Sequence, residues 1–269
     1  MRRYVNVTLN NMKFGLIGHP IAHSLSPALF KAGYNGKYPY ELIETPDFEE
    51  AYQRFLDQYD GINVTAPFKE LAYAKADIIS EECRLVGATN LLVKTTEGVV
   101  AYNSDFRGLL HWHESTVSKG SKVLIAGLGG AGKAAAVAAW KAGMEVTLMN
   151  RDMTKAEDMA LRLGCRTSVR PLSDFASCFR LADVIIYNLP VRIPEIDTLS
   201  LSMEDGKKHI LEANYKNPSF DAATLGNLHG QGIDIEYHTG RTWLLLQALT
   251  GYELFTGEKP DLSRMTEQI

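Results

Sequence analysis

A glycine-rich turn in the middle of the chain constrains the fold more than any other feature. The apolar run Lys122–Ala126 leads into Gly127, Gly129 and Gly132, spaced G-x-G-x-x-G, and a helix-forming run follows. In dinucleotide-binding folds the first glycine permits the tight turn, the second lets a pyrophosphate approach the backbone, and the third lets the helix pack close to the strand. The phosphates then lie at the helix N-terminus. The turn therefore predicts a Rossmann-type domain.

The same glycine pattern also occurs in purely structural turns, so its context matters. A strand precedes it, an alanine-rich helix over Ala131–Ala142 follows, and Glu145–Met149 reads as a second strand. More than a hundred of the 269 residues precede the turn, which is room for another domain. We therefore expect a substrate-binding catalytic domain over residues 1–104 and a dinucleotide-binding domain over 105–238. A C-terminal helical segment, 239–269, is expected to pack back on the first domain.

Composition excludes several classes of protein. A hydrophobic content of 45% and a net charge of −4 are typical of soluble globular proteins and give no electrostatic footprint for nucleic acid. No apolar stretch is long enough to span a membrane, and the N-terminus lacks a signal-peptide core. The cysteines Cys83, Cys165 and Cys178 are scattered and odd in number, which favours the reducing cytoplasm. Residues 1–11, ahead of Met12, are expected to be an extension.

Strand and helix signals alternate along the whole chain, which predicts an α/β fold. In the first part they indicate a mixed α/β domain that includes a hairpin around Thr95–Gly98. The strands expected there are Lys13–Ile17, Tyr40–Glu44, Gly61–Thr65, Leu91–Lys94 and Val99–Tyr102. In the second part the strands predict a parallel sheet with helices on both faces. These are Val123–Ala126, Glu145–Met149, Val184–Tyr187, His209–Ala213 and Ile233–Tyr237. The pattern Thr154–Glu157 predicts a capping box at the start of a helix.

The end of the second strand of the Rossmann-type domain bears on the choice of dinucleotide. An acidic residue there would bind the ribose hydroxyl of NAD, but the chain has Asn150 and Arg151. An arginine at that point can pair with the 2′-phosphate of NADP. The alternative is a solvated loop cation. Asp152, the next residue, either repels a phosphate or caps the following helix, so NAD stays open as a second cofactor.

Polar side chains in the first half stand at expected strand ends and helix starts. Ser24 and Ser26 precede a helix, where hydroxyls can hold a carboxylate or cap the helix. Thr65 and Lys69 stand at the C-terminal end of a strand, where open α/β sheets place ligands. Singly, each segment is ordinary capping, turn or surface chemistry. Together with Asn90, Asn103 and Asp105 they predict a polar pocket for a small polyhydroxylated acid.

A lysine and a carboxylate beside a nicotinamide indicate interconversion of a ketone and an alcohol. Reduction brings a hydride to the carbonyl carbon, and a proton must reach the oxygen. Lys69 can supply that proton as an ammonium group, and Asp105 can orient the lysine or share the proton.

These segments resemble the shikimate dehydrogenase family, in family order over nearly the whole chain. The matching segments are Gly18–Pro27, Asn63–Lys69, Gly87–Asn90, Asn103–Asp105, the glycine turn with Asn150 and Arg151, Tyr215–Pro218, and Gly240 with Gln247. The resemblance implies reversible, NADP-dependent reduction of 3-dehydroshikimate to shikimate, in the biosynthesis of aromatic amino acids through chorismate.

The resemblance also implies roles for individual residues. Lys69 and Asp105 are the catalytic pair. Ser24 and Ser26 hold the substrate carboxylate, with Tyr215 nearby. Thr65, Asn90 and Gln247 bind the ring hydroxyls. The residues implied in cofactor binding are Gly127, Gly129, Gly130, Ala131, Gly132, Asn150, Arg151 and Lys155.

The chain departs from the family pattern at Asp152, in the loop Tyr187–Arg192 and at Trp243, all on the cofactor side. None of these departures touches Lys69 or Asp105. Two alternatives therefore stay open: an NAD-preferring quinate/shikimate dehydrogenase, and a non-catalytic NADP- or shikimate-binding sensor. The seven histidines are predicted to be structural or solvated, with no metal. The expected partner is a small molecule, with no nucleic acid and no membrane, in a cytoplasmic monomer or homodimer.

Overall fold

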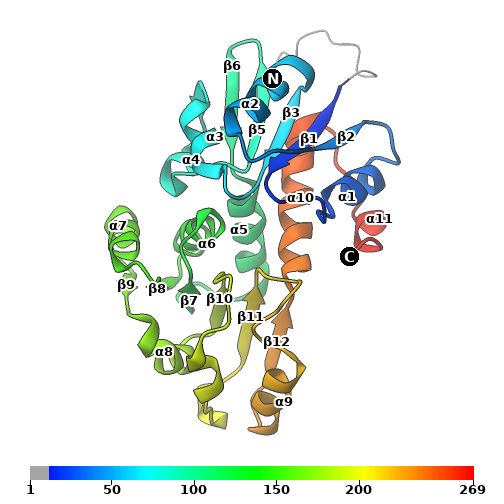
Figure 1. Cartoon of the computed structure of the whole chain (residues 1–269). Helices are drawn as coiled ribbons and strands as arrows, with labels where there is room; N and C mark the ends of the chain where they lie inside the picture. Colours follow the sequence, from blue (N-terminus) through cyan, green and yellow to red (C-terminus); the bar gives the residue numbers. More distant parts are fainter. Residues whose placement is uncertain (1–11) are drawn as a thin grey trace. The chain divides into compact units, whose positions relative to one another are not determined.

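The structure of the chain is a computed structural model that describes residues 12–269. The chain divides into two compact units (Figure 1). The first contains the chain up to Gly108 together with Leu245–Ile269, and the second contains Leu109–Leu244. The divisions fall inside two helices, whereas the expected boundaries, 104/105 and 238/239, stand near the starts of those helices. The expected extension, residues 1–11, lies outside the described residues.

The first unit is built on a six-stranded mixed sheet in the order β2-β1-β3-β5-β6-β4. β1, β2 and β3 run parallel, and the hairpin β5–β6 pairs antiparallel to β3. The strands are β1 (Phe14–Gly18), β2 (Tyr40–Glu44), β3 (Gly61–Val64), β4 (Ile78–Ile79), β5 (Leu91–Thr95) and β6 (Gly98–Tyr102). The helices are α1 (Ser26–Gly33), α2 (Phe48–Gln58), α3 (Lys69–Lys75), α4 (Glu81–Val86) and the start of α5 (Ser104–Thr116), with α10 (Gly240–Thr256) from Leu245 onward and α11 (Leu262–Thr266).

Apolar residues cover both faces of this sheet. On one face, Phe48 and Phe55 of α2 belong to a buried cluster with Ile17 of β1. On the other face, Phe14 of β1 stacks on Phe255 of α10, with ring centroids 5.0 Å apart. The C-terminal helix thus packs on the first sheet, as the sequence predicts.

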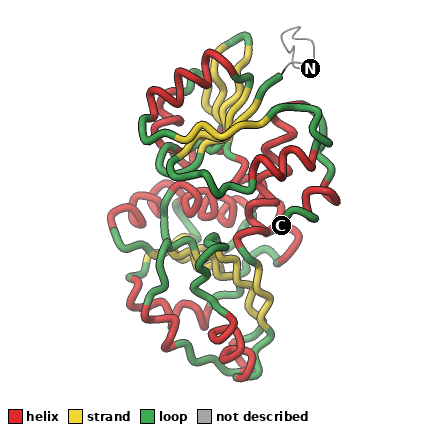
Figure 2. The backbone as a smooth tube through the Cα atoms, turned by 45° about the vertical axis from the view of Figure 1, so that its right-hand side comes forward, coloured by secondary structure: helices red, strands yellow, loops and turns green. Residues whose placement is uncertain are grey.

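The second unit contains a six-stranded sheet in the order β12-β11-β10-β7-β8-β9, in which every pair is parallel. The strands are β7 (Lys122–Ala126), β8 (Glu145–Met149), β9 (Thr167–Val169), β10 (Val184–Tyr187), β11 (Lys208–Glu212) and β12 (Ile235–His238). The helices connecting them are α6 (Gly130–Lys141), α7 (Met153–Leu163), α8 (Phe175–Leu181) and α9 (Ala222–Gly230). Figure 2 shows these strands gathered in one layer between helices.

The strand order of the second unit reverses between β7 and β10. From β7 the chain steps outward to β8 and β9, and then returns to β10 on the other side. Because crossovers between parallel strands are right-handed, α6 and α7 cover one face, and α8 and α9 cover the other. The expected Rossmann-type fold is confirmed, with its strand reversal next to the glycine turn.

Several local expectations were wrong or incomplete. The N-cap of α7 is Asp152, whose carboxylate accepts a hydrogen bond from the Thr154 backbone N–H, so the predicted capping box starting at Thr154 is wrong. Short or weakly periodic elements were missed, namely β4, α4, β9, α8, α9 and α11.

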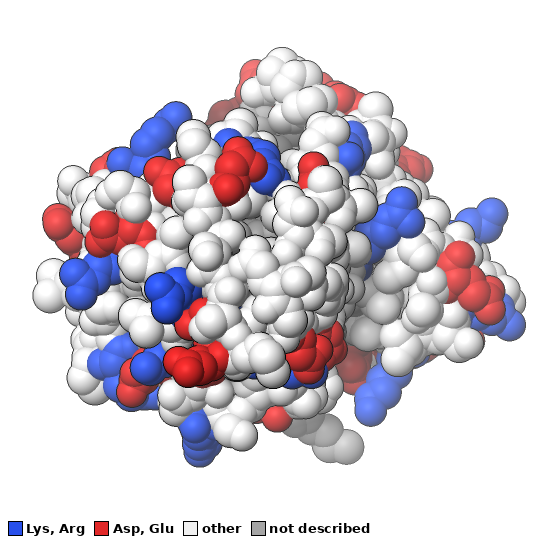
Figure 3. Space-filling view, turned by 90° about the horizontal axis from the view of Figure 1, so that it is seen from below, with Lys and Arg blue, Asp and Glu red and all other residues white. Residues whose placement is uncertain are grey.

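Within residues 12–269, no helix is both long and apolar enough to cross a membrane. On the face shown in Figure 3, basic and acidic side chains are interspersed.

His113 is a buried histidine of the second unit that gives stability a pH dependence. Its side chain is fully buried, and neither ring nitrogen has a hydrogen-bond partner among the described residues. Burial lowers its pKa from 6.5 to about 4. Between these values the unfolded chain binds a proton that the folded chain does not. The stability that depends on neutral His113 is therefore complete above pH 6.5 and is lost as the pH falls toward 4.

We expect His113→Leu to flatten this pH dependence. The histidine accounts for about 3 kcal/mol of stability lost between pH 6.5 and 4, and the leucine removes that loss without breaking a hydrogen bond. All three tryptophans lie in the second unit, so tryptophan fluorescence in a urea titration at pH 7.5 and pH 5 reports on this unit. His111→Gln, at an exposed position of the same helix, should behave as the unaltered protein. An unchanged difference between the two pH values in His113→Leu would contradict the account.

Candidate active site

The predicted substrate-binding residues of the first unit stand at one edge of its sheet. β1 and β3 are parallel, so the segments that follow them leave at the same edge. β5 runs antiparallel to β3 and β6 antiparallel to β5, which puts the start of β5 and the end of β6 at that edge too. Ser24, Thr65 and Lys69 lie after β1 and β3, Asn90 directly precedes β5, and Asp105 follows β6. The topology thus gathers side chains that are far apart in the sequence.

Lys69 and Asp105 form the ion pair that the sequence suggests. Lys69 Nζ lies 2.6 Å from Asp105 Oδ2. The exposed fraction is 16% for the lysine side chain and 7% for the aspartate side chain. Lys69 is the first residue of α3, and its carbonyl accepts a hydrogen bond from the Thr89 backbone N–H, which ties it to the segment before β5. The pair is short and mostly shielded from water, so it is suited to holding and moving one proton.

The start of α5 fixes the position of Asp105. Asn103 Oδ1 accepts a hydrogen bond from the Phe106 N–H at 2.9 Å, and Asn90 Oδ1 accepts one from the Ser104 N–H at 2.8 Å. Two buried amides therefore bind orphan N–H groups of the first helical turn. Asp105 stands in that turn, and its backbone is held on both sides.

A small polar network continues from the same turn to α10. Asn90 Nδ2 donates to Ser104 Oγ at 3.0 Å, and Ser104 Oγ donates to Gln247 Oε1 at 3.1 Å. The helices meet closely here, because a Cβ placed on Gly251 would lie 2.9 Å from Ser104 Oγ. Asn90 and Gln247, both predicted to bind ring hydroxyls, are thus neighbours. Ser104 connects them, a role that the sequence reading did not give it.

Ser24 and Ser26 place two hydroxyls together at the start of α1, whose first residue is Ser26. Their Oγ atoms lie 3.2 Å apart, and Ser24 Oγ also accepts a hydrogen bond from the Ser26 N–H. The N-cap position belongs to Leu25, and among the described residues no side chain caps α1, so the alternative that a serine caps this helix is wrong. Tyr252 of α10 donates to the Ser26 carbonyl at 3.1 Å. The serine hydroxyls and the first N–H groups of α1 together suit an anionic group.

Thr65 lies half-buried directly after β3. A Cβ on Gly18 would stand 2.4 Å from Thr65 Cγ2, so only glycine at position 18 permits the close approach of the two segments. Asn63, by contrast, serves the scaffold. Its Oδ1 accepts from Tyr40 Oη at 2.7 Å, and its Nδ2 donates to the Asn90 carbonyl at 3.3 Å.

In the second unit, each of the three glycines of the turn has a different local environment, which explains the absence of a side chain there. Gly127 has a φ of +95°, in the region that favours glycine. A Cβ on Gly132 would lie 1.9 Å from the Gly127 carbonyl oxygen, so this glycine permits the close strand–helix packing. In the part of the chain that the structure describes, a Cβ on Gly129 would meet nothing within 4 Å, and no side chain caps α6. The open second glycine and the uncapped helix N-terminus fit a pyrophosphate.

The end of β8 joins this turn. Asn150 Oδ1 accepts a hydrogen bond from the Leu128 N–H at 3.0 Å, and its Nδ2 donates to the Asp152 carbonyl at 2.9 Å. Asn150 thus connects the glycine turn to the start of α7, where Asp152 is the N-cap. Arg151 and Lys155 are exposed beside it, and neither forms an ion pair within residues 12–269. Two cations near this turn fit a 2′-phosphate.

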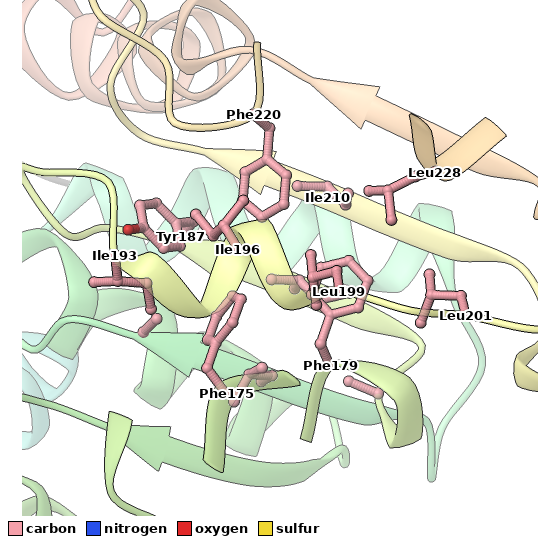
Figure 4. Packing of buried hydrophobic residues seen from close by; sticks show 14 of the residues in the cluster. Phe175, Phe179, Tyr187, Ile193, Ile196, Leu199, Leu201, Ile210, Phe220 and Leu228 are labelled. Atoms are coloured by element: carbon pink, nitrogen blue, oxygen red, sulfur yellow. The ribbon is translucent and has the colours of Figure 1, made fainter. Parts of the chain in front are cut away.

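The loop Tyr187–Arg192, which departs from the family pattern, packs against the core through Tyr187. The Tyr187 ring is fully buried against Phe175 and Phe220, as Figure 4 shows, and its hydroxyl donates to the Val191 carbonyl at 2.7 Å. Arg192 donates to the Ser219 carbonyl and pairs with Asp197. Next to Tyr187, the Asn188 backbone lies 2.8 Å from where a Cβ on Gly127 would stand. The loop therefore supports the glycine turn.

Tyr215 lies in the second unit, half-buried in the segment after β11, and its predicted role at the substrate carboxylate stays a prediction.

Sequence reasoning missed Glu212, whose carboxylate holds the far end of the segment that follows β11. Its buried carboxylate accepts hydrogen bonds from the N–H groups of Ser219 and Phe220 and from Tyr237 Oη. A lone acidic residue at the end of an apolar strand gave no signal for this role.

Both halves of the chain match known families. A model described as the shikimate dehydrogenase substrate binding domain matches residues 16–92, and one described as shikimate / quinate 5-dehydrogenase matches residues 112–198. The chain is 33% identical over 270 residues to a protein from Rubrobacter xylanophilus named shikimate dehydrogenase (NADP(+)), covering 95% of this chain and 94% of that one.

Solved structures give the same result. The shikimate dehydrogenase of Mycobacterium tuberculosis is 30% identical with a TM-score of 0.78, covering 96% of this chain and 98% of that chain. Shikimate 5-dehydrogenase from Thermus thermophilus, in complex with NADP(H) and shikimate, is 28% identical with a TM-score of 0.77 over the same shares. Matches in both halves, together with relatives that span nearly the whole chain, show that the protein belongs to the shikimate dehydrogenase family.

Proposed function

We propose that this protein is an NADP-dependent shikimate dehydrogenase, which reversibly reduces 3-dehydroshikimate to shikimate. The observation that carries the proposal is the 2.6 Å Lys69–Asp105 pair among hydroxyl and amide groups. A non-catalytic sensor would need the pocket but not the paired proton donor. The names of the relatives and the NADP(H) and shikimate complex of the Thermus enzyme support the same reaction.

The residues of the first unit have separate proposed roles in proton transfer and in substrate orientation. Bound NADPH supplies the hydride for the carbonyl carbon. The Lys69 ammonium donates a proton to the oxygen that becomes the hydroxyl, and it recovers that proton from the oxidised hydroxyl in the reverse direction. Asp105 holds the lysine in place. The hydroxyls of Ser24 and Ser26 orient the substrate through its carboxylate, far from the reacting carbonyl.

The remaining polar groups define which ring fits. Thr65, Asn90 and Gln247 are the proposed partners of the ring hydroxyls, and Tyr215 is the proposed second contact of the carboxylate. The cofactor side uses Gly127–Gly132 for the pyrophosphate, with Asn150, Arg151 and Lys155 at the 2′-phosphate. Since Asp152 is the N-cap of α7, its presence is explained without a preference for NAD. The cytoplasmic location and the choice between monomer and homodimer stay predictions.

Turnover of shikimate with NADP⁺, followed by nicotinamide absorbance, tests the function. We expect reduction of NADP⁺ by shikimate, with a higher kcat/KM than for NAD⁺. Absence of turnover with both cofactors would refute the enzyme and leave the sensor. A higher kcat/KM with NAD⁺ would instead support the quinate/shikimate alternative.

Replacing Lys69 with alanine should remove the proton donor and leave most substrate contacts. We expect kcat to fall by about 10²–10⁴-fold, with a much smaller change in KM. Lys75→Ala is the matched control, because Lys75 is the exposed last residue of the same helix and pairs with Glu49 on the surface. Undiminished turnover in Lys69→Ala would remove the assigned role.

Replacing Arg151 with serine should discriminate between the cofactors. A charge-assisted hydrogen bond to a phosphate is worth roughly 1.5–3 kcal/mol, so kcat/KM for NADP⁺ should fall about 10- to 100-fold. The value for NAD⁺, which lacks the phosphate, should change little. Arg162→Ser, at an exposed position in the last turn of α7, controls for charge. An equal loss with both cofactors would show that Arg151 does not bind the 2′-phosphate.

A further inference from the structure

Three side chains of the second unit meet on one face of the edge of its sheet. β11 and β12 are parallel, and His209 is the register partner of Glu236. Alternate residues of a strand point to the same face, so His238 shares that face with Glu236. Two imidazoles and one carboxylate therefore gather where two neighbouring strands run side by side.

The distances among them match a metal ligand set. His209 Nδ1 lies 3.4 Å from Glu236 Oε2, and His238 Nε2 lies 3.3 Å from Glu236 Oε1. All three ligand atoms lie within 4.8 Å of one another. Ligands about 2.0–2.1 Å from a tetrahedral zinc ion stand roughly 3.3–3.4 Å apart, which is the separation of each nitrogen from its carboxylate oxygen. Glu236 is partly exposed, so its side chain can rotate to complete the set.

Within residues 12–269, the two nitrogens that face the carboxylate have no hydrogen-bond partner. Among the described residues, His209 Nδ1 and His238 Nε2 are buried atoms whose contacts with Glu236 do not have the geometry of hydrogen bonds. Buried polar atoms are nearly always satisfied, so two such atoms aimed at one point need an explanation. Burial lowers the pKa of both imidazoles, which leaves them in the neutral form that binds metals.

The surroundings supply a cover and a competing cation. The Trp112 ring packs edge-on against His238, with centroids 5.3 Å apart, and shields that side of the cluster. Lys207 Nζ lies 2.8 Å from Glu236 Oε2, and its side chain is 46% exposed. A metal ion would displace this ammonium group into solvent. Lys207 therefore competes with a metal ion for the Glu236 carboxylate and lowers the affinity of the site for the metal.

We propose that His209, Glu236 and His238 form a binding site for a divalent transition-metal ion, with zinc preferred, that joins the edge strand β12 to β11. Two imidazoles and a carboxylate are ligands that zinc favours. All three ligands belong to the second unit and stand on β11 and β12, whereas the glycine turn follows β7, so we assign the site a structural role. Sequence spacing alone predicts no metal here, because only the register of β11 against β12 brings the two histidines together.

Untagged, metal-free full-length protein titrated with zinc alone tests the site. We expect one zinc ion per chain at low micromolar free zinc by equilibrium dialysis, and a rise in Tm with zinc concentration. His238→Gln and His209→Gln should each weaken binding at least about tenfold and abolish the Tm shift. His229→Gln, at an exposed position of the same unit, should bind zinc unchanged. Unchanged stoichiometry and Tm shift in His238→Gln would overturn the proposal.

A second variant keeps the test decisive where a histidine replacement unfolds the chain. Lys207→Gln removes an exposed competitor and should tighten zinc binding, whereas a cluster that binds no metal would show no zinc response to this change. Cobalt(II) in the same site should quench the fluorescence of Trp112, which contacts His238, and zinc should reverse the quenching. Zinc binding that is weaker or unchanged in Lys207→Gln, or cobalt that leaves the fluorescence unaltered, would refute the site.

Discussion

The first turn of α5 is the point on which the proposed chemistry of the protein depends. Asn103 and Asn90 hold its backbone N–H groups, and this fixes Asp105 2.6 Å from Lys69. A shielded charge is costly when its partner is absent, so the two side chains must be held close together. The hydrogen bonds that Asn103 and Asn90 accept from the backbone of α5 do this for Asp105. Gln247 of α10 joins the same network through a shared serine hydroxyl. The helix from the end of the chain thereby helps to order the site built at its beginning.

The second unit depends on a different constraint, the close approach of the α6 backbone to the glycine turn. Gly132 permits packing of α6 on the turn, and Asn150 ties that turn to the end of β8. Asp152 caps α7 and leaves Arg151 exposed beside it. In the proposed function, phosphate recognition therefore rests mainly on backbone geometry, and proton transfer rests on one pair of side chains.

Much of the fold was predictable because strand and helix signals are strong in both halves. The residues proposed to bind substrate could be named from the sequence because they stand in motifs, and the Lys69–Asp105 pair suggested there is present in the structure. What escaped prediction depends on three-dimensional packing. Tyr187 looked like a departure at a cofactor loop, yet its ring fills the core. Glu212 gave no sequence signal, because its partners are backbone N–H groups seven and eight residues further along the chain. The meeting of His209 with His238 follows from strand register, which composition and spacing do not reveal.

The central claim is that the polar edge of the first sheet binds one substrate, with the proton-transfer pair at one end and the paired hydroxyls at the other. A crystal structure of the protein with shikimate bound tests it most directly. We predict that the hydroxyl to be oxidised lies within hydrogen-bond distance of Lys69 and Asp105, and that the carboxylate lies at Ser24 and Ser26. Shikimate bound elsewhere, or bound with its carboxylate against Lys69, would contradict the account.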